Sequence, residues 1–469
     1  MKETPRLTAL SAALMVALGC AVGAVGAQEI PVPAPPGVSS QGASSPGVTS
    51  PGVSSQGAGT PQEAPTLKLG ELLTLAREQS PRLQAAFFKV EATRAREAEA
   101  GLLPDPALMV GVANLAIPEF SATMPASMVP SFQATQRFPL AGKRSLQAEI
   151  ARQSTEIDGA TAEEVWWAVR TEAALAFFEL YRVDRQTTVL RQTLGLLQDF
   201  ETVALSMYSA GSGPQADVLR AGVALARMEA DVERLSALRK GVAARLNALV
   251  NRPTDTPVPT PELASLPLDI PPPETLVAWA LEGRPALQGM QLAVRRASFN
   301  GELAGKAIWP DLTLGVQYAL GRMDGDPRSM GGASIGFSLP IYAGKRQKKL
   351  REEAAALEGM VRAQLDDAIA SVSSGVSQSL AELDRARTLL QLYQEDILPQ
   401  AGAAVESSLS SYRVGAVDFM ALIDSQMAVN RFEGEYFELL ASYGAALARL
   451  EMTIGRDLPV SGDFILEIR

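Results

Sequence analysis

Cys20 is the one residue of the chain whose surroundings suggest a covalent modification. It is the only cysteine, and Leu18-Gly19-Cys20 fits a lipoprotein cleavage box, in which this cysteine becomes the acylated first residue. The same stretch also fits an ordinary signal peptide of residues 1–27, whose small residues Val25-Gly26-Ala27 allow cleavage before Gln28. Retention of the apolar stretch as a membrane anchor is a third interpretation, which the small residues at its end disfavour. The first two interpretations both place the mature chain outside the cytoplasm.

Other residues that could carry chemistry are scarce. The 469-residue chain contains no histidine, the commonest metal ligand and the commonest general base near neutral pH. A single cysteine cannot form an intramolecular disulfide or a multi-cysteine zinc site. The formal net charge of −10 argues against nucleic acid as a partner, because nucleic acids attract basic surfaces. We therefore expect no catalytic residues, no bound metal and no cofactor, and the protein is not expected to be an enzyme.

The predicted helices and strands begin after a linker. Residues 28–65 are rich in proline, glycine and serine, and the string from Pro36 to Ala43 recurs from Pro51 to Ala58. Such a segment cannot bury a core and is read as a disordered linker. The folded part of the chain is expected to start near residue 66.

From residue 66 onward the sequence is duplicated. Four blocks recur in the same order, and the outermost two are each separated by 204 positions. The matched positions are Pro81 and Pro285, Pro104 and Pro310, Phe138 and Leu339, and Tyr208 and Tyr412. A period this long is typical of a duplicated half-protein rather than of a solenoid. We assign residues 66–265 to the first repeat, 266–457 to the second, and 458–469 to a C-terminal tail.

Each repeat opens with a helix and continues with two strands. The first helix is expected over Leu67–Leu103, with Thr66 as its N-cap and Pro104 at its end. In the second repeat, residues 312–321 and 333–341 alternate between apolar and small or polar side chains, which is typical of strands. A polar loop, residues 322–332, separates them. The first repeat has a similar strand beginning at Leu108 and a fainter partner over residues 128–138, interrupted by Pro130.

Very long helices follow the strands. No proline occurs between Pro139 and Pro214, and about 65 helical residues would span about 100 Å. The second repeat has its own long helix over residues 345–412, in which Pro399 predicts a kink. Each long helix turns at a glycine and returns. The returning helix of the first repeat has apolar residues at steps of three and four, which is typical of a coiled coil: Leu225, Met228, Val232, Leu235, Leu238, Val242, Leu246 and Leu249.

These strands predict a shared membrane barrel. An exported chain with alternating strands of about ten residues is typical of an outer-membrane barrel, where no strand edge can remain open to lipid. Four strands per chain cannot close a barrel, whereas three chains supply twelve. The predicted fold is an α+β membrane protein: a trimeric 12-stranded β-barrel continued by a long α-helical coiled-coil tunnel.

In these features the chain resembles a TolC-type outer-membrane efflux protein, of the outer membrane factor family. The resemblance covers residues 66–457 and rests on the duplication, on the strand ends at Phe138 and Leu339 followed by Gly-Lys-Arg, and on two Tyr-x-x-Gly turns. The run from Tyr208 to Arg220 and the segment from Leu246 to Pro253 resemble the branch that serves heavy-metal efflux.

The resemblance implies a passive exit duct in a tripartite efflux system. A homotrimer in the outer membrane of a Gram-negative cell would extend its helices into the periplasm. There its tips would dock to a periplasmic adaptor protein and an inner-membrane pump of the RND type. The cargo stays open between metal cations and drugs or other organic solutes.

The resemblance also assigns roles to residues at the helical tips. Val414-Gly415 matches the turn that the adaptor grips in the family, and Ala210-Gly211 matches it with a smaller residue. Asp424 lies at a position of the acidic ring that closes the family's tunnel, although Ala421 replaces the companion acid. Asp217, in the corresponding place of the first tip, and Tyr412 resemble residues that hold the closed state. Val417 replaces the arginine that often joins this latch, and Asp418 could contribute acidity instead.

Two other classes of protein compete with the duct. A structural coiled-coil envelope spacer would account for the long helices, but it needs no alternating apolar strands. A soluble protein with helices around a small sheet conflicts with helices this long. Ion conductance in lipid bilayers separates the duct from both.

Overall fold

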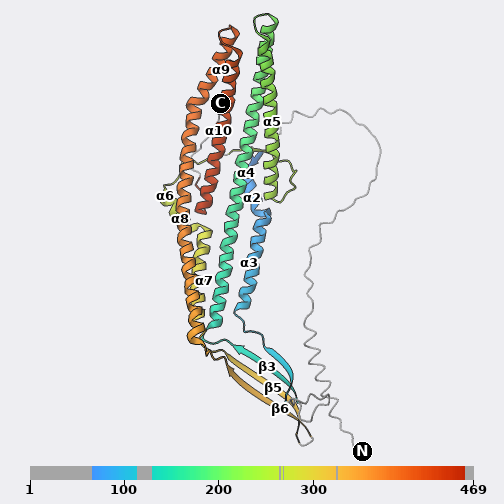
Figure 1. The fold of residues 1–469 in the computed structure, drawn as a ribbon, viewed down its shortest axis with the longest axis vertical. Helices are drawn as coiled ribbons and strands as arrows, with labels where there is room; N and C mark the ends of the chain where they lie inside the picture. The colour runs from blue at the N-terminus through green and yellow to red at the C-terminus, as the bar shows by residue number, and fades with distance from the viewer. Residues whose placement is uncertain (1–65, 114–128, 264–265, 268, 324–325, 460–469) are drawn as a thin grey trace, which may run out of the picture. The chain divides into compact units, whose positions relative to one another are not determined.

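The computed structural model describes residues 66–113, 129–263, 266–267, 269–323 and 326–459. The predicted signal segment with Cys20, the linker 28–65, the loop between the first two strands and most of the tail 458–469 lie outside these residues. The described residues form one unit (Figure 1).

Two similar series of elements follow one another along the chain. The first is β1 (Thr66–Lys68), α2 (Leu69–Gln79), α3 (Pro81–Ala100), β2 (Ala107–Ala113), β3 (Val129–Phe138), α4 (Lys143–Ser209) and α5 (Gln215–Leu249). The second is β4 (Thr260–Glu262), α6 (Pro273–Gly283), α7 (Pro285–Lys306), β5 (Leu312–Met323), β6 (Asp326–Phe337), the π turn η1 (Ala343–Gln347), α8 (Lys348–Leu392), the π turn η2 (Tyr393–Ile397), α9 (Leu398–Arg413) and α10 (Phe419–Ile454).

The start of each series differs from the single helix that the sequence predicts. Strand β1 pairs in parallel with β4, and Thr66 Oγ1 donates a hydrogen bond of 2.7 Å to Glu262. Thr66 is therefore not an N-cap, and this prediction was wrong. The predicted first helix is also two helices, because Ser80 is extended ahead of Pro81. A residue before proline disfavours the helical conformation, and proline is well tolerated as the first helical residue.

Strands β2, β3, β5 and β6 form one antiparallel sheet in that order. Pro130 lies inside β3 opposite Val112, so it does not interrupt this strand. Strand β6 begins at Asp326 and ends at Phe337, which makes the β5–β6 loop much shorter than predicted and leaves Leu339 and Ile341 outside the sheet. The two strands at the edges of the sheet are β2 and β6.

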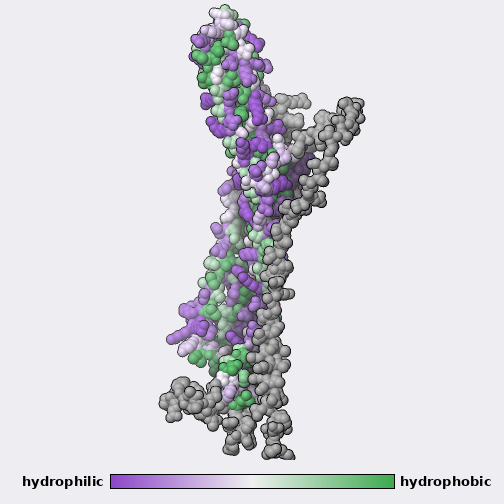
Figure 2. All heavy atoms as spheres, turned by 90° about the vertical axis from the view of Figure 1, so that its right-hand side faces the viewer, coloured by the Kyte–Doolittle hydropathy of each residue, from purple (hydrophilic) through white to green (hydrophobic). Residues whose placement is uncertain are grey.

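The faces of this sheet differ in polarity as the alternation predicts. In register across the sheet, Leu108 lies opposite Ala134, which lies opposite Val316. On the other face Thr135 lies opposite Gly315, which lies opposite Ser334. The apolar side chains are exposed on the sheet, and hydrophobic residues gather toward the strand end of the molecule in Figure 2.

The predicted long helix of the first series is confirmed, because α4 runs for 67 residues without interruption. The second series covers the same distance with α8 and α9, separated by η2. Pro399 is the second residue of α9, which begins where η2 ends. Proline lacks an N–H and clashes with the carbonyl four residues earlier, here Glu395 within the π turn. The widened turn thus accommodates Pro399.

The returning helix α5 packs through its predicted coiled-coil positions. Met228, Val242 and Leu246 are buried, and Leu225, Val232 and Leu235 pack against a buried cluster. Leu238 is the exception because its side chain is exposed.

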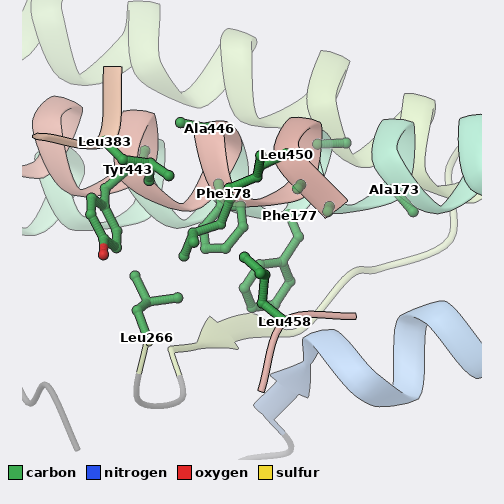
Figure 3. Packing of buried hydrophobic residues seen from close by; sticks show 14 of the residues in the cluster. Ala173, Phe177, Phe178, Leu266, Leu383, Tyr443, Ala446, Leu450 and Leu458 are labelled. Atoms are coloured by element: carbon green, nitrogen blue, oxygen red, sulfur yellow. The ribbon is translucent and has the colours of Figure 1, made fainter. Parts of the chain in front are cut away.

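The larger hydrophobic core lies in the middle of the helices. Phe177 and Phe178 of α4 meet Tyr443, Ala446 and Leu450 of α10 (Figure 3). Gly444 allows this approach, because a Cβ at this position would lie 2.2 Å from the Phe178 ring. Leu266, between the two series, and Leu458, after α10, also pack into this core. The first residue of the predicted tail is thus part of the core.

A second buried cluster lies near the helical tips. It contains Leu197 and Phe200 of α4, Ala221 of α5, and Phe419 and Leu422 of α10. Among the helices that the structure describes, none is long and apolar enough to cross a membrane.

Candidate functional site

The two helical tips have the same backbone. Gly211 and Gly415 both adopt φ +73°, a left-handed conformation that favours glycine. Each turn closes with two backbone hydrogen bonds at equivalent places. Gly211 N donates to Tyr208 O at 3.0 Å and Ser212 N to Met207 O at 2.9 Å, while Gly415 N donates to Tyr412 O and Ala416 N to Ser411 O, both at 2.9 Å. This pattern ends a helix by satisfying its last carbonyl groups. Both hairpin turns lie at the end of the helices away from the sheet (Figure 1).

The side chains at the turns differ in exposure. Val414 is 78% exposed at the second turn, and Ala210 and Gly211 are exposed at the first. Tyr208 is 44% exposed, whereas its counterpart Tyr412 is only 3% exposed. The first turn thus presents a small surface and the second an apolar one.

The structure brings Tyr412 and Asp217 together. The Tyr412 hydroxyl donates a hydrogen bond of 3.3 Å to Asp217 Oδ2, and both side chains are buried. The Tyr412 ring also packs against Phe419, with 5.3 Å between ring centroids. The contact joins the second hairpin to the first hairpin of the same chain. The resemblance grouped these two residues, but it did not predict their contact within one subunit.

Burial and the neighbouring carboxylate stabilise the neutral form of Tyr412. Burial, the charge of Asp217 and its hydrogen bond together raise the pKa of Tyr412 to about 12. Tyr412 therefore remains a hydrogen-bond donor throughout the neutral range.

An arginine also reaches Asp217, from a position that sequence reasoning missed. Arg220 lies one turn further along α5, and its guanidinium is 3.4 Å from Asp217 Oδ1. Val417 had suggested that the latch lacks an arginine. The signal was present in the sequence as an acidic and a basic residue three positions apart on a helix.

The two tips carry different charges at equivalent positions. Counted from the turn glycine, Asp217 matches Ala421, and Arg220 matches Asp424. Asp217 therefore corresponds to Ala421, one helical turn before the position of Asp424, and not to Asp424 itself. Asp424 and Arg220 are both exposed. Asp418 caps α10 by accepting a hydrogen bond of 2.9 Å from Ala421 N, so it stabilises the helix start.

A charged cluster at the opposite end of the helices joins the sheet to the helical part. Asp311, just before β5, is buried and accepts hydrogen bonds from Lys143 Nζ, at 2.8 Å, and from Arg137 of β3. Lys143 also donates to Trp309 O at 2.6 Å. The cluster pins the start of α4 to the end of α7. The repeated Pro-Asp and Gly-Lys-Arg blocks contained these residues, but sequence analysis assigned them no contact.

The ionised form of Asp311 dominates in this cluster. Burial alone would raise the pKa of the Asp311 carboxyl, but the hydrogen bonds and charges of Lys143 and Arg137 outweigh burial and lower it. Within the described ranges, no three Cys, Asp or Glu side chains lie close enough together to hold a metal ion.

Comparison with known proteins assigns these features to a family. The family model described as outer membrane efflux protein matches residues 276–456, from α6 to the end of α10. The chain carries an outer membrane efflux protein domain. The resemblance to TolC-type channels is confirmed, and the efflux domain is that of an outer-membrane protein whose helices lie in the periplasm.

Two relatives match more than four fifths of this chain. The cobalt-zinc-cadmium resistance protein CzcC of Cupriavidus metallidurans is 21% identical over 401 residues, covering 84% of this chain and 92% of CzcC. The pyoverdine export outer membrane protein OpmQ of Pseudomonas putida is 23% identical over 433 residues, covering 83% of this chain and 86% of OpmQ.

Solved structures share the fold. A structure of CusC has a TM-score of 0.73 at 15% identity and covers 86% of this chain and 95% of its own. The outer membrane protein VceC of Vibrio cholerae has a TM-score of 0.70 at 16% identity, covering 83% of this chain and 96% of its own. The fold of this chain is thus shared with these outer-membrane proteins.

Proposed function

We propose that this efflux protein is one subunit of a homotrimeric, passive exit duct in a tripartite efflux system. The observation that carries the proposal is a four-stranded sheet joined to helices as long as 67 residues. One face of this sheet is apolar and exposed, and its two edges pair with no other strand among the described residues. Open edges in lipid leave backbone groups without partners, so copies must pair. Three copies supply the twelve strands that a conducting barrel needs.

The duct itself performs no chemistry in this proposal. An inner-membrane pump, of the RND class, supplies the energy, and a periplasmic adaptor connects it to the tips. Val414 and Gly415, with Ala210 and Gly211, form the adaptor-docking surface. Its support is that an exposed valine beside a tight turn offers an apolar contact that the turn itself does not use.

Conductance tests the duct directly. Purified protein inserted into planar lipid bilayers is expected to give discrete conductance steps, and its mass in detergent to equal three chains. A trimer that never conducts at any voltage or pH would contradict the channel role and favour the envelope spacer.

Gating is proposed to reside at the tips. The buried Tyr412–Asp217 contact holds the two hairpins of one subunit together, and Asp424 faces the axis with its two symmetry mates. Three carboxylates near the axis would attract cations. Arg220 occupies the equivalent position of the other hairpin, so three positive charges would alternate with the three negative ones. The proposed ring is of mixed charge rather than purely acidic.

The cargo separates two versions of the proposal. CzcC is named for resistance to cobalt, zinc and cadmium, whereas OpmQ is named for export of pyoverdine, an organic molecule. Deletion of the gene, followed by growth on graded concentrations of these metals and of organic toxins, distinguishes a metal duct from an organic-solute duct.

A further inference from the structure

The junction between β3 and β5 within one chain suggests how two chains join. At this junction the strand of one repeat pairs with the strand of the other, and Asp311 of the second repeat is neutralised by Lys143 of the first. The duplicated sequence supplies the same elements again at the outer edges β2 and β6. Those edges carry the counterparts of both charged residues.

The equivalence of the two repeats is shown by the strands themselves. Asp105 matches Asp311 at an offset of 206, and Phe138 matches Leu339 at an offset of 201. Shifted by these two offsets, the observed pair Ala107–Thr135 becomes Thr313–Gly336. That pair is the one observed between β5 and β6. The offsets thus describe equivalent positions in the structure as well as in the sequence.

With the same offsets, the β3–β5 pairing within one chain predicts the β6–β2 pairing between two chains. The observed pairs Gln136–Leu314 and Ala134–Val316 become Phe337 opposite Leu108 and Ile335 opposite Val110. All four of these edge side chains are apolar and highly exposed, Leu108 by 72% and Ile335 by 71%. A slip of one residue would turn one edge to the opposite face. The register therefore continues the apolar face from one chain to the next.

The charged residues at the edges complete the argument. Lys143 corresponds to Lys345, the residue after Ala343-Gly344 in the duplicated Gly-Lys-Arg block. Asp105 and Lys345 are exposed, and neither forms an ion pair with any residue that the structure describes. Their counterparts Asp311 and Lys143 are largely buried, with side-chain exposures of 6% and 14%.

The helices repeat this asymmetry between inner and outer positions. Helix α4 packs against both α3 and α7. Its counterpart α8 packs against α7, and no helix among the described residues takes the place of α3 beside it. Both helices carry exposed apolar side chains, Leu357 and Met360 on α8 and Phe87 and Phe88 on α3.

We propose that β6 of one copy pairs antiparallel with β2 of the next copy, with Phe337 opposite Leu108, and that Lys345 forms an ion pair with Asp105 across this junction. The occupant of each open edge is thus a second copy of this chain. The proposal rests on the proposed trimeric duct and defines the contacts that close it. In the assembled ring, Asp105 would be buried and neutralised as Asp311 is within the chain.

Cysteine cross-linking tests the register. Gly336→Cys and Met109→Cys lie directly opposite each other in it, on the polar face, and a Cβ at Gly336 meets only ordinary contacts. Oxidation of the double variant in membranes is expected to give covalent trimers in denaturing gels. It should react at least about tenfold faster than the pair Gly336→Cys with Gly111→Cys, whose diagonal separation exceeds disulfide reach.

Gly336→Cys alone and Met109→Cys alone are the controls for cross-links that form through Cys20. The register is overturned if Gly336→Cys with Gly111→Cys cross-links faster than Gly336→Cys with Met109→Cys. It is also overturned if neither pair cross-links in a protein that remains a conducting trimer. The proposed duct is unaffected by either outcome. A protein that is monomeric in membranes overturns both the register and the proposed function.

A charge exchange tests the ion pair independently. Asp105→Lys and Lys345→Asp are each expected to lower the temperature at which the trimer dissociates, and the double variant to restore it. Asp105→Lys combined with Lys240→Asp, an exposed lysine on α5, is the matched control and should restore nothing. Equal dissociation temperatures for all these variants overturn the pair.

Discussion

The two helical tips share one backbone conformation but differ in the side chains around it. Both turns use a left-handed glycine and the same pair of hydrogen bonds, because an antiparallel return of two helices demands them. The tyrosine before each glycine is exposed in the first tip and buried against Asp217 in the second. A duplicated structure thus keeps the geometry that folding requires, and its copies diverge where side chains are free to specialise.

High pH should produce the largest difference in stability between the two tips. The pKa of Tyr412 is raised to about 12 from an ordinary value of 10. Between these pH values Tyr412 stays neutral in the folded tip but ionises in the unfolded chain. The stabilisation of the folded tip by neutral Tyr412 is therefore complete below pH 10 and is lost as the pH rises toward 12. The loss is at most about 2.7 kcal/mol. Hydrogen exchange of the second tip between pH 9 and 11, compared with Tyr412→Phe, measures it.

The matched phenylalanine variants come next. Tyr412→Phe removes the hydroxyl donor from Asp217 Oδ2 and leaves only Arg220 near the other carboxylate oxygen. It should destabilise the tips by about 1–3 kcal/mol, the cost of a buried polar atom that loses its hydrogen bond. Tyr208→Phe at the exposed counterpart should change stability by less than about 0.5 kcal/mol. Urea unfolding followed by a fluorescent probe on the tip compares the two. Equal losses would mean that the buried contact contributes nothing.

The glycines should show the tips to be alike. Gly211→Ala and Gly415→Ala each force an L side chain into φ +73° and should cost roughly 1–2 kcal/mol, with the same value in both tips. Gly195→Ala, an open site inside α4, is the control and should be neutral or stabilising by up to about 1 kcal/mol. Local hydrogen exchange at each turn gives the values. A difference of more than about 1 kcal/mol between the turns would refute a common backbone requirement.

Selectivity should change least but in opposite directions. Asp424→Ala removes a negative charge near the proposed axis and should weaken cation preference and cation block, whereas Arg220→Ala should strengthen both. Each permeability ratio is expected to shift about two- to fivefold, equivalent to under about 1 kcal/mol. Reversal potentials in asymmetric salt measure it. Parallel shifts in the two variants would remove the mixed ring.

Sequence reasoning identified the parts of the molecule whose local chemistry determines them. The absence of proline predicted α4, alternation predicted the strands, and glycine predicted the turns. It missed β1 and β4, which have three residues each and too little alternation to be recognised. It also missed the cluster around Asp311 and mistook Thr66 for a helix cap.

The missed contacts share a physical cause. Tyr412 lies 195 positions from Asp217, and Asp311 lies 168 from Lys143, so only the packing of the whole chain brings them together. Local propensity carries no information about such pairs. The duplication does carry it indirectly, because one observed junction predicts its counterpart.

The π turns have a consequence for how the protein can tolerate change in length. From the proline at the strand end to the tyrosine at the tip, 69 positions separate Pro139 from Tyr208 and 72 separate Pro340 from Tyr412. In a continuous α-helix three more residues would add about 4.5 Å and rotate the tip by about 300°. The second half instead takes up its surplus in the loop before η1 and in two widened turns. The extra residues thus widen single helical turns and lengthen a loop without lengthening the helix. Both hairpins therefore end at the same end of the molecule.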